Sequence, residues 1–262
     1  MRLVTRIALA LALSAPLVGL GGHGARATAA TFDGSFTNPA SSQTDTAEAV
    51  FSVSGQELTL VLTNTSTFGQ YQNPDVLSGL FFNISGSPAL TGVSATASGL
   101  VDPATAGPQD VSHAWAFEQS ASGYTGGAAT LQQTRYGVAA AGFSSLSPSF
   151  GKSGFGSGKA DNTQGLDYSI VGPDFRSIKG NGAGTLVEDS VTFLFSGLPQ
   201  SFSLSDISDV VFAYGTAPDY TVAAASTTGT STSSAAVPEP ASLALLLPGL
   251  ITLGLFRRRS AA

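Results

Sequence analysis

The residue types that most often carry enzyme chemistry are scarce in this chain. Its 262 residues include no cysteine and two histidines, His23 and His113. A Ser-His-Asp hydrolase needs a base and a serine in a Gly-x-Ser-x-Gly turn, and the sequence contains no such turn. A zinc site usually draws on several His or Cys ligands, and His23 falls in a segment typical of export signals. We therefore expect His113 to be a structural histidine that shares a strand face with Trp115, and the protein not to be an enzyme.

A glycine-rich stretch, residues 151–160, invites comparison with a phosphate-binding loop. It reads Gly-Lys-Ser-Gly-Phe-Gly-Ser-Gly-Lys-Ala. The first glycine of the motif would have to stand at Ser153, and Ala160 stands where a Ser or Thr should hold magnesium. The stretch is better interpreted as a loop, and no cofactor is expected.

Carboxylates are more plentiful, and calcium is the metal they would suit. Five lie in the Gly- and Ser-rich centre of the chain or near the last expected strands: Asp161, Asp167, Asp174, Asp206 and Asp209. Extracellular modules bind calcium weakly through such oxygen ligands. Residues 161–165 lack the acidic spacing and the closing Glu of an EF-hand loop, so no metal ligands are assigned. A glycosidase pair of carboxylates stays open, because it leaves no sequence signature.

Aromatic side chains offer a second kind of ligand site. Six could stack on sugar rings if several lay together on one face: Tyr71, Trp115, Tyr124, Tyr136, Tyr168 and Tyr220. Scattered surface aromatics need no such explanation. We expect Trp115 in the core and the tyrosines at separate turns. A carbohydrate- or calcium-binding adhesin is kept as the alternative function.

Short strands dominate the elements that would position these groups. Residues 57–64 alternate, with Leu58, Leu60 and Leu62 on one face, and a short turn joins them to a preceding strand. Further strands are expected at 49–54, 76–84, 90–97, 111–119, 185–188, 190–196, 201–204 and 209–214. Residues 130–141 have enough Ala, Gln and Leu to suggest one short helix. The pattern predicts an all-β fold, a single β-sandwich, with a jelly-roll-type barrel as the alternative.

The charge balance excludes one class of partner. Between Asp33 and Asp219 there are 16 acidic residues and five basic ones, a difference of −11, whereas the whole chain carries −6. A domain without a basic footprint is not expected to bind nucleic acid.

The N-terminus is typical of a secretory signal peptide. Arg2 and Arg6 precede an apolar run over 7–20, and small residues around 25–29 provide cleavage sites. We assign residues 1–30 to this signal and 31–220 to one extracytoplasmic domain. In 221–236, 14 of 16 residues are Ala, Ser or Thr, which predicts a flexible linker.

The last stretch, residues 237–259, has three parts in a fixed order. It begins with Pro238, Glu239 and Pro240, and we expect Val237 and Glu239 to be extended, because proline fixes its own φ and restricts the residue before it. Residues 241–256 are uncharged and would reach roughly 24 Å as a transmembrane helix. Arg257, Arg258 and Arg259 follow and would stay on the cytoplasmic side of the membrane.

This motif, helix and basic tail resemble the PEP-CTERM sorting signal of exported proteins in Gram-negative, often biofilm-forming bacteria. The resemblance implies recognition at Pro238, Glu239 and Pro240 by an exosortase, a membrane transpeptidase-like enzyme. It also implies a transient inner-membrane stage, cleavage near the motif, and transfer to the cell surface or the extracellular matrix.

A second similarity concerns the body of the chain. Short pieces such as 60–66, 76–82, 196–199 and 212–216 are similar to those of exosortase-dependent surface proteins whose bodies have no established activity. We therefore expect an exported, non-enzymatic surface or matrix protein, with polysaccharide as a possible partner and a hydrolase as the least favoured reading.

Overall fold

The computed structural model describes residues 29–101, 104–121, 124, 131–140, 154–156, 166–179, 184–216 and 220–227. Within these ranges the chain forms fifteen β-strands and three single-turn 3-10 helices, and no α-helix. The expected all-β class is confirmed. Thirteen of the strands belong to one hydrogen-bonded network, and the other two pair separately.

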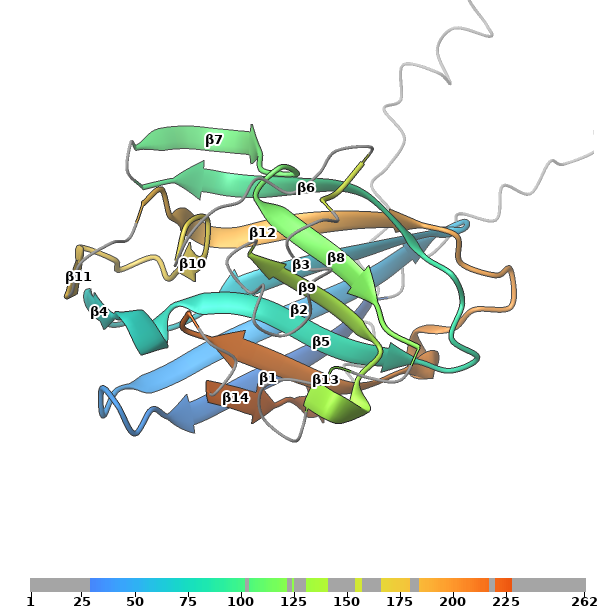
Figure 1. The fold of residues 1–262 in the computed structure, drawn as a ribbon, viewed down its shortest axis with the longest axis horizontal. Helices are drawn as coiled ribbons and strands as arrows, with labels where there is room; N and C mark the ends of the chain where they lie inside the picture. Colours follow the sequence, from blue (N-terminus) through green and yellow to red (C-terminus); the bar gives the residue numbers. More distant parts are fainter. Residues whose placement is uncertain are drawn as a thin grey trace, which may run out of the picture.

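The network consists of two sheets that face each other (Figure 1). The first has the order β7-β6-β12-β3-β2-β1-β15. Its strands are β7 (Thr105–Asp110), β6 (Thr91–Leu100), β12 (Val187–Ser196), β3 (Glu57–Asn64), β2 (Thr44–Ser54), β1 (Ala29–Thr37) and β15 (Ala225–Thr227). The second has the order β8-β9-β5-β13-β14. Its strands are β8 (Trp115–Gln119), β9 (Tyr136–Ala140), β5 (Leu77–Ile84), β13 (Ile207–Tyr214) and β14 (Tyr220–Ala223).

A short strand, β10 (Ile170–Val171), joins the two sheets. It pairs in parallel with the start of β12 and, through Ile170, antiparallel with Leu77 of β5. A separate parallel pair, β4 (Gln70–Gln72) and β11 (Ser177–Lys179), lies at one end of the molecule (Figure 1). The 3-10 helices are η1 (Asn73–Asp75), η2 (Leu131–Gln133) and η3 (Leu204–Asp206). Over the described residues the sheets do not close, which favours the sandwich over the barrel alternative.

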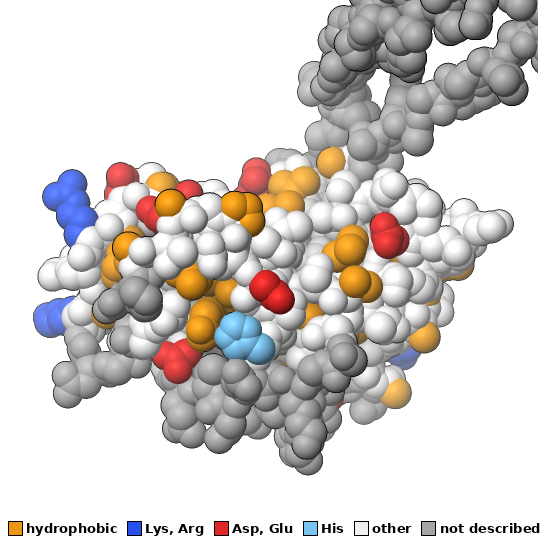
Figure 2. All heavy atoms as spheres, turned by 90° about the horizontal axis from the view of Figure 1, so that it is seen from above, with side chains coloured by type: hydrophobic (Ala, Val, Ile, Leu, Met, Phe, Trp, Pro, Cys, Tyr) orange, Lys and Arg blue, Asp and Glu red, His pale blue; other side chains and the backbone are white. Residues whose placement is uncertain are grey.

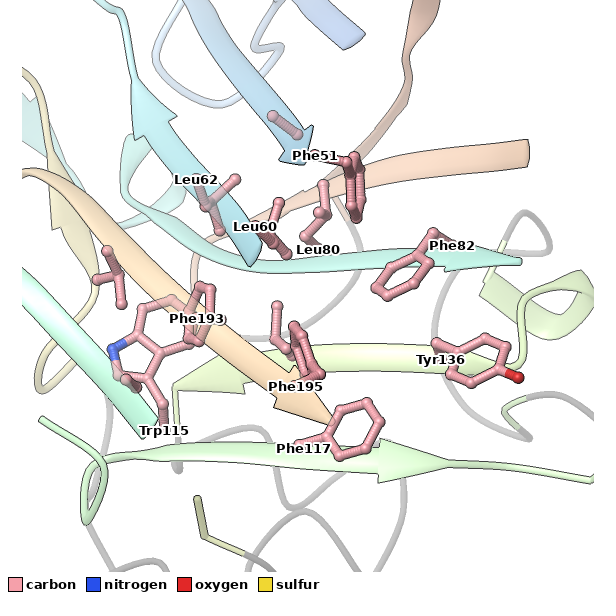
Figure 3. Packing of buried hydrophobic residues seen from close by; sticks show 14 of the residues in the cluster. Phe51, Leu60, Leu62, Leu80, Phe82, Trp115, Phe117, Tyr136, Phe193 and Phe195 are labelled. Atoms are coloured by element: carbon pink, nitrogen blue, oxygen red, sulfur yellow. The ribbon is translucent and has the colours of Figure 1, made fainter. Parts of the chain in front are cut away.

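Aromatic side chains from both sheets fill the space between them (Figure 3). Phe51 of β2 meets Phe82 of β5 with ring centroids 5.2 Å apart. Trp115 of β8 meets Phe193 of β12 at 5.0 Å. These rings are fully buried, and burial of apolar surface is the main favourable term in folding.

Alternation along the strands decides which residues enter this core. In β3 the leucines at 58, 60 and 62 are buried, while the side chains between them are half-buried on the other face. The turn from β2 to β3 has two residues, Gly55 and Gln56, and Gly55 has a φ of +61°, which glycine adopts without strain. The expected hairpin is confirmed.

β5 departs from simple alternation because both of its faces are covered. Leu80 and Phe82 face the space between the sheets. Phe81 faces outward, where it packs with Tyr124 at 5.1 Å and belongs to a second apolar cluster with Leu131. Because both faces are covered, seven of the eight residues of β5 are buried, Ser78 and Gly79 among them.

Four expectations about local structure were wrong or too broad. The suggested helix at 130–141 is a single 3-10 turn, η2, followed by strand β9, because pairing with β5 and β8 overrides helix propensity. The strand expected at 111–119 begins only at Trp115, after a turn. The strand expected at 201–204 is a turn leading into η3. Thr221–Thr227, expected as linker, pair with β13 and β1, while 228–236 lie outside the described residues.

The two ends of the described chain meet. Thr31 of β1 pairs with Thr227 of β15, so the chain enters and leaves the domain side by side. The other end of β1 leads into loop 38–43, where Asn38 donates to the Pro74 carbonyl at 2.9 Å, beside β4. From Thr31 to Thr37 a strand spans roughly 20 Å. The β4–β11 pair therefore lies at the opposite end of the molecule from the two chain ends.

Candidate functional site

Beside the β4–β11 pair, the segment that leads into β11 lies against the residues that follow β3 of the first sheet. The backbone N–H of Arg176 donates to the Gly69 carbonyl at 2.8 Å, just before the strands pair. Gly172 makes the approach possible, since a Cβ there would lie 2.2 Å from the Ser66 carbonyl oxygen. Its N–H donates to the Tyr71 hydroxyl at 2.8 Å.

A third apolar cluster forms the floor of this end. Its fully buried members are Tyr71, Val76, Leu166, Val171 and Leu186. Partly buried side chains pack against them: Phe68, Val101, Phe175 and Ile178. The Tyr71 ring lies 5.6 Å from that of Phe175. Through Ile178, which packs against this cluster, β11 rests on a buried apolar floor.

Two open hollows flank Arg176. One, of about 410 Å³, is lined by apolar members of the floor together with Arg176 and Ser177. The other, of about 390 Å³, is lined by polar residues that include Gln70, Asp174 and the same Arg176 and Ser177. A third hollow over β1 and β2 is larger, about 510 Å³, but Asp33 is its one charged lining residue within the described chain.

The aliphatic part of Arg176 packs on the backbone, and its guanidinium lies at the two hollows. Its Cδ lies 3.2 Å from the position that a Cβ on Gly69 would take, so the aliphatic part rests on that glycine. No ion pair to Arg176 occurs within the part of the chain that the structure describes. Arg135, at the other end of β5, instead donates from Nη1 to Ser87 Oγ at 2.8 Å. Figure 2 shows Lys and Arg side chains at the end of the molecule where β11 lies.

A buried acidic network lies beneath the same end. Asp45 and Asp75 are both fully buried. Asn38 Nδ2 donates to Asp45 Oδ2 at 3.0 Å, the Ser41 hydroxyl donates to Asp75 Oδ1, and the Gln72 N–H donates to Asp75 Oδ2 at 2.9 Å. The network fastens loop 38–43 to η1.

The network is not fully satisfied. Among the described residues, Asp45 Oδ1 and the Tyr214 hydroxyl are buried without a hydrogen-bond partner. The pKa of the Asp45 carboxyl is raised to about 8, chiefly by burial, with the hydrogen bond from Asn38 opposing the rise and the Asp75 charge adding to it. Burial also raises the pKa of Tyr71 to about 12 and that of Tyr214 well above its ordinary value. Asp45 is therefore protonated at neutral pH.

The histidine prediction holds only in part. Trp115 is fully buried, as expected, and its indole N–H donates to the Tyr168 carbonyl at 3.1 Å. His113 does not share its strand face, because residues 112–114 form a turn and His113 is exposed. The imidazole meets the Tyr168 ring edge-on at 5.2 Å, which is a packing contact.

The tyrosines do not form an exposed platform. Tyr71, Tyr124 and Tyr136 are buried rather than scattered at turns, and Tyr168 is half-buried. The side chain of Tyr220 lies outside the described part. Over the described residues, Val93 is the one large apolar side chain that is exposed.

The carboxylates considered for calcium are dispersed. Asp206 Oδ2 accepts the Ser203 N–H at 2.9 Å and caps η3, while Asp209 Oδ2 accepts from Asn83 at 2.8 Å. Asp174 lies at the edge of the second hollow, and Asp161 lies outside the described residues. No group of three or more His, Cys, Asp or Glu side chains suited to a metal occurs in the described part.

The sorting-signal residues lie outside the described ranges. These are Pro238, Glu239 and Pro240, the apolar run 241–256, and Arg257, Arg258 and Arg259; residues 1–28 of the expected signal peptide lie outside them too. Within the described ranges, no helix is long and apolar enough to cross a membrane.

Comparisons with known proteins do not assign this chain to a family. No family model, no curated protein and no solved structure matches this chain. The fold and the site define a class, an all-β, sandwich-like protein with an open-sided hollow at one end. Sequence reasoning missed Arg176, Asp45 and Asn38. The one available signal concerned Arg176: basic residues are scarce in this domain, so each basic residue is notable.

Proposed function

We propose that this chain is an exported, non-enzymatic cell-surface or extracellular-matrix protein. Its N-terminal segment directs export, and the helix at 241–256 holds it in the inner membrane for a time. An exosortase-type enzyme then recognises Pro238, Glu239 and Pro240 and releases the domain to the surface. Arg257, Arg258 and Arg259 keep the tail on the cytoplasmic side during this stage.

The pairing of Thr31 with Thr227 is the observation that carries the proposal. When both chain ends emerge at the same side of a domain, the domain can be attached at that side, and its opposite side then faces outward. The opposite end carries β4, β11 and the hollows beside Arg176. A surface protein needs this arrangement, because its attachment must not obstruct the face that it presents.

The packing of the interior supports a non-enzymatic role. The space between the sheets is filled by side chains such as Phe82, Trp115 and Phe193. Within the described residues, the one carboxyl whose pKa is strongly raised is Asp45, which is fully buried in contact with Asn38 and cannot meet a substrate in that position. A general acid has to reach the group that it protonates.

The intact mass of the protein from its native host tests the proposal. Cell envelope and medium are analysed separately. We expect a species that starts near residues 28–31 and ends near 238–240, found outside the inner membrane. A species that keeps Phe256 and the three arginines, and is confined to the inner membrane, would contradict processing and leave a tail-anchored protein.

Replacing Glu239 with Ala should abolish release, whereas Ser231→Ala, in the linker, should not.

A further inference from the structure

We propose that the two hollows beside Arg176 bind an acidic polysaccharide, one whose sugar rings carry carboxylates. Arg176 pairs with a ring carboxylate, and the apolar face of the same ring lies on the floor beside Phe175 and Ile178. This goes beyond the proposed function and does not depend on it, because the site would bind such a polymer whether or not the chain is processed at Pro238–Pro240.

The charge of Arg176 singles it out as the recognition group. Between Asp33 and Asp219 the chain carries a net −11, so a polyanion is repelled over most of the surface. At the hollows, Arg176 has no ion pair within the described residues and offers a planar fork that fits a carboxylate. Lys179, exposed on β11, lies three residues further along and lines neither hollow, so within the described chain Arg176 is the cation that lines them.

The lining of the hollows suits a sugar rather than a purely ionic ligand. In the first hollow, Val101, Ile178 and Leu186 present apolar surface beside the guanidinium. In the second, the Gln70 amide and the Asp174 carboxylate present groups that hydrogen-bond to hydroxyls, and Asp174 disfavours a ring carboxylate beside it, which leaves Arg176 as the position for that charge. Sites for small ligands combine an apolar lining with a few polar groups in this way. Arg176 and Ser177 line both hollows, so the two hollows are adjacent and a ligand at either one meets the same arginine.

The shape of the site also favours a polymer. Both hollows are open at the surface, with volumes of about 410 and 390 Å³. They lie at the end opposite the place where the described chain begins and ends, where Thr31 pairs with Thr227, so that place lies away from a long ligand in the hollows. Nucleic acid would need many phosphate contacts, and two exposed cations do not supply them.

Binding of the purified full chain to polygalacturonate, with dextran as the neutral polymer, tests the site. We expect retardation by polygalacturonate in affinity electrophoresis and little by dextran. Arg176→Ala should weaken the binding about tenfold, the loss of one charge-assisted pair. Arg176→Lys should fall between the two. The matched control is Arg135→Ala, which removes an exposed arginine at the other end of β5.

Several outcomes would overturn the proposal. These are equal retardation by dextran, no retardation by either polymer, or equal losses for the Arg176 and Arg135 variants. Vesicles of anionic phospholipid are measured alongside. If they bind through Arg176 and polygalacturonate does not, the site recognises a membrane surface instead. A thermal unfolding curve of each variant separates loss of the site from loss of the fold.

Discussion

At the scale of single residues, Asp45 is the most unusual group in the molecule. Its carboxyl is fully buried, Oδ1 has no partner among the described residues, and Asp75 lies close enough to interact with it electrostatically. Such a group keeps its proton to avoid placing an unpaired charge in an apolar interior. It therefore couples the stability of loop 38–43 to pH.

The sign of this coupling follows from the proton count. The pKa of Asp45 rises from 3.8 in a free side chain to about 8 in the folded protein. Between these values the folded state holds a proton that the unfolded state has lost. Rising pH then lowers the free energy of unfolding by about 1.4 kcal/mol per pH unit from this group alone. The effect of this group is present in full below its unfolded pKa and ends above pH 8 or so.

Asp45→Asn should remove this pH dependence. The amide has the same shape, stays neutral, and can still accept from Asn38. Between pH 5 and 7 we expect the wild type to lose roughly 3 kcal/mol of stability that the variant keeps. Urea denaturation at the two pH values measures the difference.

Asp110→Asn is the matched control. Asp110 is exposed, and its pKa is lowered by hydrogen bonds from Ser112. A lowered pKa affects stability only in the acid range, so this variant should track the wild type between pH 5 and 7. Parallel pH profiles of wild type and Asp45→Asn would show that Asp45 is ionised in the folded protein and would refute the assignment.

At the scale of elements, β12 is the strand on which the first sheet depends. It pairs with β3 on one side and β6 on the other, and Val191, Phe193 and Phe195 all face the core. A central strand with both edges paired holds its neighbours together, and its inward side chains pack in the middle of the core. Its alternation was also among the clearest in the sequence.

Phe193→Ala should be among the most damaging single changes. The ring lies 5.0 Å from Trp115 and 5.3 Å from Phe155, and neither neighbour can fill the space that it leaves. We expect a loss of about 3–5 kcal/mol in the free energy of unfolding. Thr192→Ala, on the other face of the strand, should cost less than about 1 kcal/mol. Equal losses for the two variants, by chemical denaturation, would mean that residue 193 does not face the core.

The sequence revealed elements best where alternation was strong and local. The run 57–64 and the apolar run of β5 were recovered because each strand carries its own pattern. Residues 136–140 were misjudged as helix because Tyr-Gly-Val-Ala-Ala has no alternation. All five residues are buried, and it is pairing with β5 and β8 that makes the segment a strand. Thr221–Thr227 look like a linker by composition, and only pairing with distant strands makes them sheet.

At the scale of the whole molecule, the candidate site could not have been predicted. The first hollow is built from segments near 101, 175 and 186, and the second from segments near 69 and 176. Such neighbours follow from long-range pairing between strands, which carries no signature in a single sequence. The charge balance predicted only that nucleic acid is not a partner, and it gave no indication of which arginine would line a hollow.

The meeting of the two chain ends is the feature on which the outward orientation depends. Opposed residues in an antiparallel pair have Cα atoms roughly 4.5–5.5 Å apart, within the range that a disulfide bridges. Because the chain has no cysteine, a pair introduced as Thr31→Cys and Thr227→Cys has no competing thiols. We expect an intramolecular disulfide to form under mild oxidation, detected as the loss of both thiols in a mass-tag assay.

The control pair is Thr31→Cys with Gln70→Cys, which places the second thiol on β4, at the opposite end of the molecule. It should keep both thiols free under the same conditions. If the first pair also stays reduced, or both pairs oxidise alike, Thr31 and Thr227 are not neighbours in solution. The domain would then have its two ends apart, and attachment at one of them would no longer determine which face points outward. If only the first pair oxidises, the two ends of the described chain are neighbours, and the hollows beside Arg176 lie at the end of the domain away from them.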